Sequence, residues 1–139
     1  MKVHKLFTEY SYDFRLLGLS TAVKEFKLAW LINQALTIRL VKESDIVIES
    51  LKSNNLIISN YSFFTEHSCI RLLKNKNVDY QTATKTYLIP EVRHLDYLLI
   101  LDGTLNASEV FEKIKPIPII AHLEVVDVLK LKSKENLIF

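Results

Sequence analysis

The segment of residues 90–97 holds the side chains with the clearest chemical potential. Its two carboxylates, Glu91 and Asp96, stand on either side of Arg93 and His94. A histidine titrates near neutral pH and neighbouring carboxylates can raise its pKa, so this group could support acid/base chemistry. The same residue types also build turns, because Asp96 can accept backbone N–H groups and Arg93 can pair with either acid. We favour the structural interpretation, and after it a docking surface for a partner, over catalysis.

Other kinds of site find little support in the sequence. Cys69 is the only cysteine, so no intramolecular disulfide can form, and we expect a packed thiol. His67 could share a strand face with Cys69, but the histidines at positions 4, 94 and 122 are scattered, and a structural zinc site needs four compactly spaced ligands. A nucleophile elbow and a glycine-rich phosphate loop are both missing from a chain with two glycines. We therefore expect no metal, no cofactor and no enzymatic activity.

Length and composition predict one globular domain. The chain has 139 residues and a mass of 16.1 kDa, with 49% hydrophobic residues and a net charge of +2. So small a net charge gives no general reason to expect nucleic acid or an anionic membrane as partner. Glu9 and Asp13 interrupt any apolar run near the N-terminus, and no stretch approaches the ~20 apolar residues of a membrane span. We expect a cytoplasmic protein with a single domain over residues 1–139.

The elements of the first half follow from hydrophobic periodicity. Alternation predicts a strand over 10–16 that ends before Gly18. Helical spacing predicts a helix over 21–36, capped by Ser20 or Thr21, with one apolar face. Residues 46–48 are either a short strand or a helical turn. β-branched and aromatic residues predict a strand over 56–65, with Tyr61, Phe63 and Phe64 in the core. A tight connection over 66–68 then predicts a returning strand over 69–74. The apolar face of the helix comprises Ala22, Phe26, Ala29 and Trp30.

The second half contains the most apolar segment. Residues 95–101 predict a central, buried strand, and residues 82–89 and 119–131 are expected to be extended. Asn106 and Glu109 resemble a capping box for a helix over 107–113. Gly18 and Gly103 both fall where a strand is expected to hand over to a helix. This order predicts an α+β domain with a mainly antiparallel sheet and two helices on one face, in a ferredoxin-like or ACT-like arrangement.

One segment resembles a known signature. Residues 89–97 read Ile-Pro-Glu-Val-Arg-His-Leu-Asp-Tyr, which is similar to the motif of the bacterial IPExxxVDY family, with Leu95 in the place of the motif's valine. Residues 132–139 are also similar to the ending of that family, and the chain length suits a whole member. The resemblance implies a small cytoplasmic bacterial protein of uncharacterised function, and it supplies no catalytic residues.

We interpret the chain as a non-enzymatic interaction or adaptor module. A protein partner is expected, a homodimer is compatible with the sequence, and a membrane is not expected. The apolar end of the tail over 132–139 must be buried, either on its own domain or on a partner. The candidate interaction surface consists of Pro90, Glu91, Arg93, His94, Asp96, Tyr97, Lys132, Lys134, Leu137, Ile138 and Phe139.

Two alternatives stay open. The first is an ACT-like domain that senses a small ligand through the turns at Gly18 and Gly103. The second is an RNA-binding accessory protein, because basic and aromatic residues together can bind single strands. Its basic residues would be Arg71, Lys74 and Lys76 at a hairpin end and Lys130, Lys132 and Lys134 along one face of an extended tail.

Overall fold

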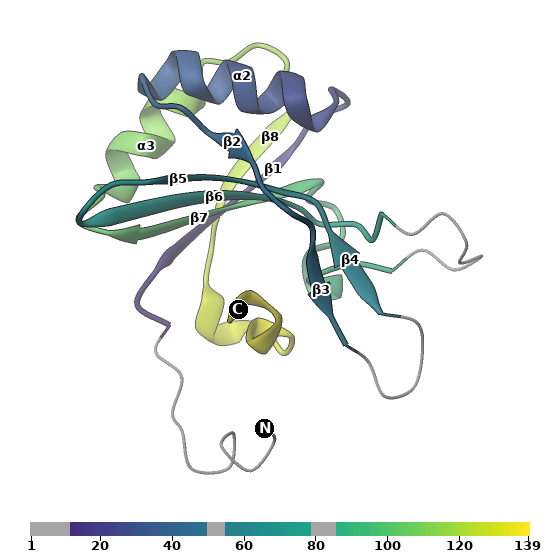
Figure 1. Cartoon of the computed structure of the whole chain (residues 1–139). Helices are drawn as coiled ribbons and strands as arrows, with labels where there is room; N and C mark the ends of the chain where they lie inside the picture. Colours follow the sequence, from purple (N-terminus) through teal and green to yellow (C-terminus); the bar gives the residue numbers. More distant parts are fainter. Residues whose placement is uncertain (1–11, 50–54, 79–85) are drawn as a thin grey trace.

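A six-stranded sheet with two helices on one of its faces forms the body of the molecule (Figure 1). The computed structural model describes residues 12–49, 55–78 and 86–139. The helices are α2 (Glu25–Leu36) and α3 (Ala107–Ile114). The strands are β1 (Arg15–Ser20), β2 (Val41–Lys42), β3 (Ile46–Ile48), β4 (Leu56–Ile58), β5 (Asn60–Phe64), β6 (Ser68–Lys74), β7 (Tyr97–Gly103) and β8 (His122–Val126). Short 3-10 turns cover Pro90–Val92, Val128–Lys130 and Lys134–Leu137.

The sheet topology is ferredoxin-like with an insertion. The strand order is β2-β5-β6-β7-β1-β8, and every neighbouring pair is antiparallel. The units β1-α2-β6 and β7-α3-β8 therefore reproduce the βαββαβ order, with β8-β1-β7-β6 as the spatial order. The chain between α2 and β6 adds β2 and β5 to the sheet and pairs β3 with β4 in a separate hairpin. The predicted α+β class and the placement of both helices on one face are confirmed.

Strand β7 lies inside the sheet, as its apolar sequence predicted. It pairs with β6 along its whole length, from Ser68↔Gly103 to Lys74↔Tyr97, and with β1 on its other side. The side chains of residues 97–101 are all buried, because both faces of the strand are covered. The predicted strand began two residues earlier, at Leu95, which is fully buried but lies before the ladder begins.

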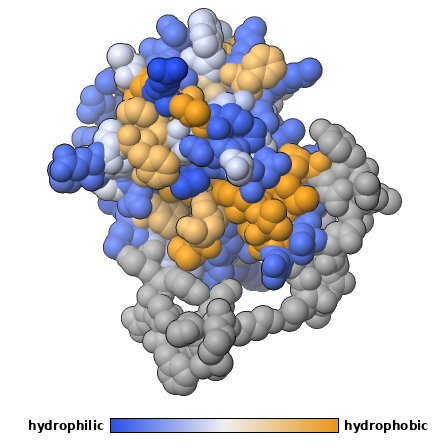
Figure 2. Space-filling view, in the orientation of Figure 1, coloured by the Kyte–Doolittle hydropathy of each residue, from blue (hydrophilic) through white to orange (hydrophobic). Residues whose placement is uncertain are grey.

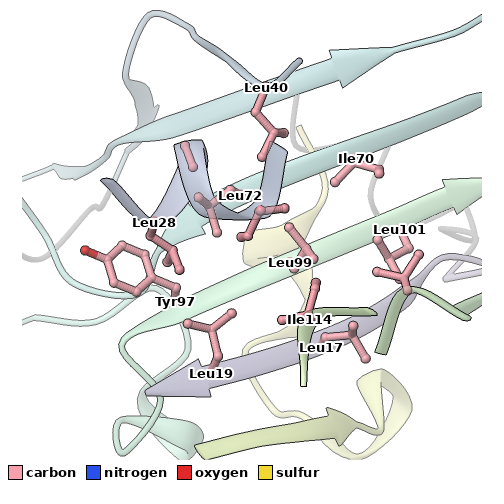
Figure 3. Close-up of a cluster of buried hydrophobic side chains, with 13 residues drawn as sticks. Leu17, Leu19, Leu28, Leu40, Ile70, Leu72, Tyr97, Leu99, Leu101 and Ile114 are labelled. Carbon is pink, nitrogen blue, oxygen red and sulfur yellow. The ribbon is translucent and has the colours of Figure 1, made fainter. Parts of the chain in front are cut away.

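Two hydrophobic clusters cover the two faces of the sheet. The first packs α2 and α3 onto alternate residues of β1, β6 and β7, among them Leu17, Leu72 and Leu99 (Figure 3). The second lies on the opposite face, where Leu16, Leu98 and Ile100 contact residues outside the helices. Those residues come from the C-terminal turns, the segment before β7 and the β3–β4 hairpin, which all lie below the sheet in Figure 1. The chain's own C-terminal segment thus closes the helix-free face.

The first strand and helix differ from their predicted positions. β1 runs over Arg15–Ser20, so Gly18 lies within the strand, and the predicted segment before Tyr12 falls outside the described residues. A Cβ on Gly18 would come within 2.2 Å of Leu95 Cδ1, so the glycine allows close packing rather than a turn. Helix α2 begins at Glu25 with Lys24 as its N-cap. The hydroxyls of Ser20 and Thr21 do not cap it, because they donate to the carbonyls of His94 and Ile119.

The buried face of α2 also differs from the prediction. Leu28, Ala29 and Ile32 are buried, whereas Phe26 and Trp30 are 64% and 58% exposed. The helix carries apolar residues on both of its sides, and packing against the sheet selects the stripe that contains the aliphatic residues. Phe26 and Trp30 are four residues apart, so they stand next to each other on the outer surface.

Two segments predicted as single strands are divided. Residues 56–65 form β4 and β5 with a break at Ser59, because β4 pairs with β3 while β5 joins the main sheet. Residues 119–131 contain β8 followed by the 3-10 turn Val128–Lys130, so Lys130, Lys132 and Lys134 do not follow one extended strand. Residues 46–48 form a strand, and 82–85 lie outside the described residues.

The second helix confirms its predicted capping. Helix α3 begins at Ala107, and the Asn106 side chain accepts a 3.2 Å hydrogen bond from the Glu109 backbone N–H. Gly103 ends β7 with a φ of +88°, a conformation that favours glycine. In the part of the chain that the structure describes, neither helix is long and apolar enough to cross a membrane.

Candidate functional site

The segment of residues 89–96 is fixed by one buried side chain, that of Asn75. Asn75 follows β6 directly and is fully buried. Its Nδ2 donates to the carbonyls of Ile89, Val92 and Leu95 at 3.4, 3.2 and 3.0 Å, and its Oδ1 accepts from the Ile89 N–H at 2.8 Å. Its backbone N–H donates to the Asp96 carbonyl at 2.9 Å. The segment that resembles a family signature is thus held from its inner side by a single amide.

Asp96 connects the same segment to β1. Its Oδ2 accepts a 2.9 Å hydrogen bond from the Thr21 backbone N–H, and its own N–H donates to the Leu19 carbonyl at 2.9 Å. Tyr97, the next residue, is buried and donates from its hydroxyl to the Val23 carbonyl at 3.2 Å. Burial raises the pKa of Tyr97 to about 12, with smaller contributions from Glu25 and Asp96. Tyr97 is therefore a core residue and cannot form part of an exposed interaction surface.

Glu91 joins this segment to the C-terminal tail. Its carboxylate accepts from the backbone N–H and the hydroxyl of Ser133, both at 2.8 Å. Burial acts to raise the pKa of Glu91, but these hydrogen bonds outweigh burial and lower it. The two stretches named separately in the sequence analysis, 90–97 and 132–139, are therefore neighbours in space.

The tail packs on its own domain. Leu137 is only 4% exposed and belongs to the cluster on the helix-free face. This burial answers the question of where the apolar end of the chain is covered, and it removes Leu137 from the candidate surface. Lys134 lies with its Nζ 5.5 Å from the centre of the Tyr12 ring. Pro90, Arg93, Lys132 and Phe139 are exposed and Ile138 is half-buried.

Arg71 lies between two exposed phenylalanine rings. Its guanidinium carbon is 5.5 Å from the ring centre of Phe64 and 5.3 Å from that of Phe139, within the range of cation–π contacts. The two phenylalanines are 59% and 53% exposed, so Phe64 is not a core residue as predicted. Together they border a concavity of about 300 Å³. We call it the Arg71 concavity; its lining includes Phe64, Cys69, Arg71, Asp102, Ile138 and Phe139.

Cys69 is half-buried at this concavity. Burial raises the pKa of its thiol, while the nearby Arg71 charge acts in the opposite direction. The thiolate is the nucleophilic form, so a raised pKa argues against a reactive cysteine. This agrees with the expectation of a packed thiol.

A second constellation joins residues that are far apart in the sequence. Glu124 accepts from Nε2 of His94 through Oε1 at 3.1 Å and from Nε2 of His122 through Oε2 at 3.0 Å. The hydrogen bond with His122 is the main cause that lowers the pKa of Glu124. The prediction that His94 and His122 are scattered is therefore wrong, because the fold brings them together. Among the described residues, this is where three potential metal-ligating side chains meet.

The acid/base trio considered from the sequence does not converge. Glu91 bonds to Ser133, Asp96 to Thr21, and His94 to Glu124, so each side chain is engaged with a different partner. The turn at Gly18 on which the ligand-sensing alternative depended is absent, since Gly18 lies within β1.

Three features of these sites escaped the sequence analysis. Asn75 and Glu124 were not singled out, and the contact of Arg71 with Phe139 joins residues 68 positions apart. A polar residue directly after a buried strand is a weak signal for Asn75, and the i,i+2 spacing of His122 and Glu124 on one strand face is another.

Comparison with known proteins gives no relative. No family model matches the chain, and the searches of curated proteins and of solved structures find no match to it. The resemblance of residues 89–97 to the IPExxxVDY family therefore stays a prediction.

Proposed function

We propose that this chain is a non-enzymatic protein-interaction module that docks a partner peptide in the Arg71 concavity. The observation that carries the proposal is the arginine held between two exposed phenylalanines at the edge of a hollow. Tyrosine, tryptophan and arginine dominate binding energy at interfaces, and apolar side chains around them exclude water. A hollow of about 300 Å³ has room for one or two side chains of an extended segment.

The charges of the concavity favour a particular occupant. Arginine has five N–H donors, and within the described part of the chain the Arg71 guanidinium donates one of them to Asn60 Oδ1 at 3.1 Å. A carboxylate could take a bidentate position on the remaining donors, while an apolar neighbour of that carboxylate lies on Phe64 or Phe139. Asp102 lines the same hollow, and its charge opposes a run of several phosphates more strongly than a single carboxylate paired with Arg71. We therefore expect a peptide with an acidic residue beside an apolar one, rather than a single-stranded RNA.

A capture experiment with matched variants tests the proposal. The full chain is used as bait in bacterial lysate, with and without nuclease, beside a Phe64→Ser/Phe139→Ser variant. A Phe26→Ser/Trp30→Ser variant is the control, because it removes two equally exposed aromatic rings from the outer side of α2. Circular dichroism establishes that all three chains are folded.

We expect the bait to capture one protein in stoichiometric amount, whether or not nuclease is added. The α2 variant should still capture this protein, and the Phe64→Ser/Phe139→Ser variant should not. Its binding segment, once mapped, should contain the acidic and apolar pair. Loss of the partner with the α2 variant instead would place the docking surface on the outer side of α2 and would contradict the proposal. Recovery of nuclease-sensitive material alone would favour the RNA-binding alternative, and thermal stabilisation by a small molecule would favour ligand sensing.

We also propose, from the resemblance of residues 89–97, that the chain belongs to the IPExxxVDY family and is cytoplasmic. The anchoring of Glu91 and Asp96 supports a structural role for these two acids of the motif.

A further inference from the structure

We infer that His94, His122 and Glu124 form a binding site for a divalent transition-metal ion of the zinc type. Two imidazoles and one carboxylate are a common set of three protein ligands for zinc, in sites where a fourth position stays open. The potential ligand atoms of the three residues all lie within 4.8 Å of one another. All three side chains reach solvent, with exposed fractions of 57%, 51% and 35%. We call this group the His-Glu-His site.

The backbone fixes the three side chains in relation to one another. His122 and Glu124 are two residues apart on β8, so they project from the same face of the edge strand. In the β1–β8 ladder Ser20 is paired with His122 and Gly18 with Glu124. The Ser20 hydroxyl donates to the His94 carbonyl at 2.6 Å, which attaches the segment before β7 opposite His122.

Residues next to His94 hold the same position from the other side. Leu95 is fully buried and lies directly over Gly18, where any larger residue would displace it. The Asp96 N–H donates to the Leu19 carbonyl, and the Asn75 side chain fixes the Leu95 carbonyl. His94 therefore stands on a rigid segment. Preorganised ligands of this kind lose little conformational entropy on binding an ion.

The distances suit a zinc ion. Zinc binds imidazole nitrogen at ~2.0–2.1 Å and carboxylate oxygen at ~2.0–2.2 Å, so two ligand atoms of a tetrahedral site are roughly 3.3–3.5 Å apart. The Nε2 to oxygen distances of 3.1 and 3.0 Å are a few tenths of an ångström shorter. The two imidazole rings, with centres 6.3 Å apart and planes at 53°, can open by small side-chain rotations because they are exposed. The ion would take the place of the Nε2 protons that now lie between each ring and the carboxylate, and each neutral imidazole would carry its proton on Nδ1 instead.

The donor set also selects the class of ion. Imidazole nitrogen favours zinc, copper and nickel, whereas magnesium and calcium prefer shells made of oxygen alone. Three protein ligands leave a fourth position, which faces solvent beside edge strand β8 and is filled by water or by a donor from another molecule. Because the hydrophobic clusters lie elsewhere, the chain should fold without the ion.

Calorimetric titration of the untagged full chain with Zn²⁺ and with Mg²⁺ tests the inference. The variants are His94→Ala, His122→Ala and Glu124→Gln. His67→Ala is the matched control, because His67 is an exposed histidine 3.9 Å from Glu66, and no third ligand joins this pair among the described residues. We expect one Zn²⁺ per chain, no saturable Mg²⁺ binding, and at least ~10-fold weaker Zn²⁺ binding in each site variant. His67→Ala should bind as the wild type does.

Co²⁺ gives a second readout, since the intensity of its visible absorption reports four-coordinate nitrogen and oxygen ligation. The absorption should appear with the wild type and His67→Ala and disappear with the three site variants. Zn²⁺ binding of wild-type affinity in any one of the three site variants would overturn the three-ligand site. So would the lack of saturable one-to-one binding by the folded wild type. Circular dichroism of each variant separates loss of the ion from loss of the fold.

Discussion

Replacement of Asn75 by alanine should be among the most damaging single changes to this protein. Asn75 is fully buried, and its side-chain amide forms hydrogen bonds at both ends of the segment 89–95. Alanine keeps the backbone bonds of residue 75 to Leu88 and Asp96 but removes every side-chain bond. The measured change in stability therefore reports the contribution of the side-chain amide, separately from the backbone hydrogen bonds between β6 and β7.

The expected loss follows from counting the groups that alanine would leave without their partner. The carbonyls of Ile89 and Val92 have second donors, the N–H groups of Val92 and Leu95. The Ile89 N–H and the Leu95 carbonyl depend on the Asn75 side chain. An unsatisfied buried polar group costs about 1–3 kcal/mol, so two such groups lower the free energy of unfolding by about 2–6 kcal/mol. A domain of this size has about 5–15 kcal/mol in total, so the variant should fold with a much reduced margin.

Urea denaturation followed by circular dichroism measures this loss directly. Asn55→Ala is the matched control, because Asn55 is exposed, and its effect should stay within about 0.5 kcal/mol. Hydrogen exchange of the Ile89 amide should accelerate in Asn75→Ala relative to the amides of β7. If Asn75→Ala lowers the free energy of unfolding by less than about 1 kcal/mol, the amide does not hold the segment and the reasoning fails.

Three further changes test other contacts. Glu91→Gln should lower the free energy of unfolding by about 0.5–1 kcal/mol at pH 7, allowing for solvent exposure. Because the bonds from Ser133 lower the pKa of Glu91, the wild type has this advantage above the unfolded pKa of about 4.3, and urea titrations should show it vanish as the pH falls through the folded value. Tyr97→Phe should cost about 1 kcal/mol by loss of the bond to the Val23 carbonyl. The raised pKa of Tyr97 means that wild-type stability declines as the pH rises from 10.0 towards about 12, and denaturation at alkaline pH should show a smaller decline in the variant. Leu137→Ala should cost about 2–4 kcal/mol in thermal or urea unfolding if the tail is part of the core, and a cost below about 1 kcal/mol would contradict that.

Local signals were sufficient for parts of the fold. The continuous apolar run of β7 and the capping residues of α3 each indicate their structure within a few residues. The apolar face of α2 could not be chosen in the same way. That helix has an aliphatic stripe and an aromatic stripe, and only the shape of the sheet beneath it determines which stripe is buried.

Gly18 and Asn75 show why longer-range features escaped prediction. Gly18 was assigned to a turn because glycine favours turns, yet its role is to accommodate Leu95, which is 77 residues later in the chain. Asn75 begins a polar stretch that is typical of a loop, and its burial depends on the return of residues 89–95 over it. A sequence shows the type of such a residue, but its contact is created by the topology.

In the candidate sites, too, local residue types could be predicted but long-range contacts could not. Glu91 and Asp96 were recognised as residues with turn chemistry, and that interpretation agrees with their hydrogen bonds to backbone N–H groups. The His-Glu-His site could not be predicted, because His94 and His122 are brought together only by β1, which pairs with both β7 and β8.

Both proposed sites lie on the face of the sheet without helices. Alternation along β6 places Ile70 under the helices and Arg71 on the opposite face, and Val126 in the second cluster places Glu124 on that same face. The C-terminal turns cover the middle of this face through Val128, Leu131 and Leu137. Figure 2 shows that hydrophobic side chains reach the surface in separate patches between hydrophilic ones. Since the tail closes the centre of this face, the accessible parts of the face lie on the two sides of the tail. The Arg71 concavity lies towards β5, and the His-Glu-His site lies at edge strand β8. Phe139 lines the Arg71 concavity, so the tail itself forms one of its walls.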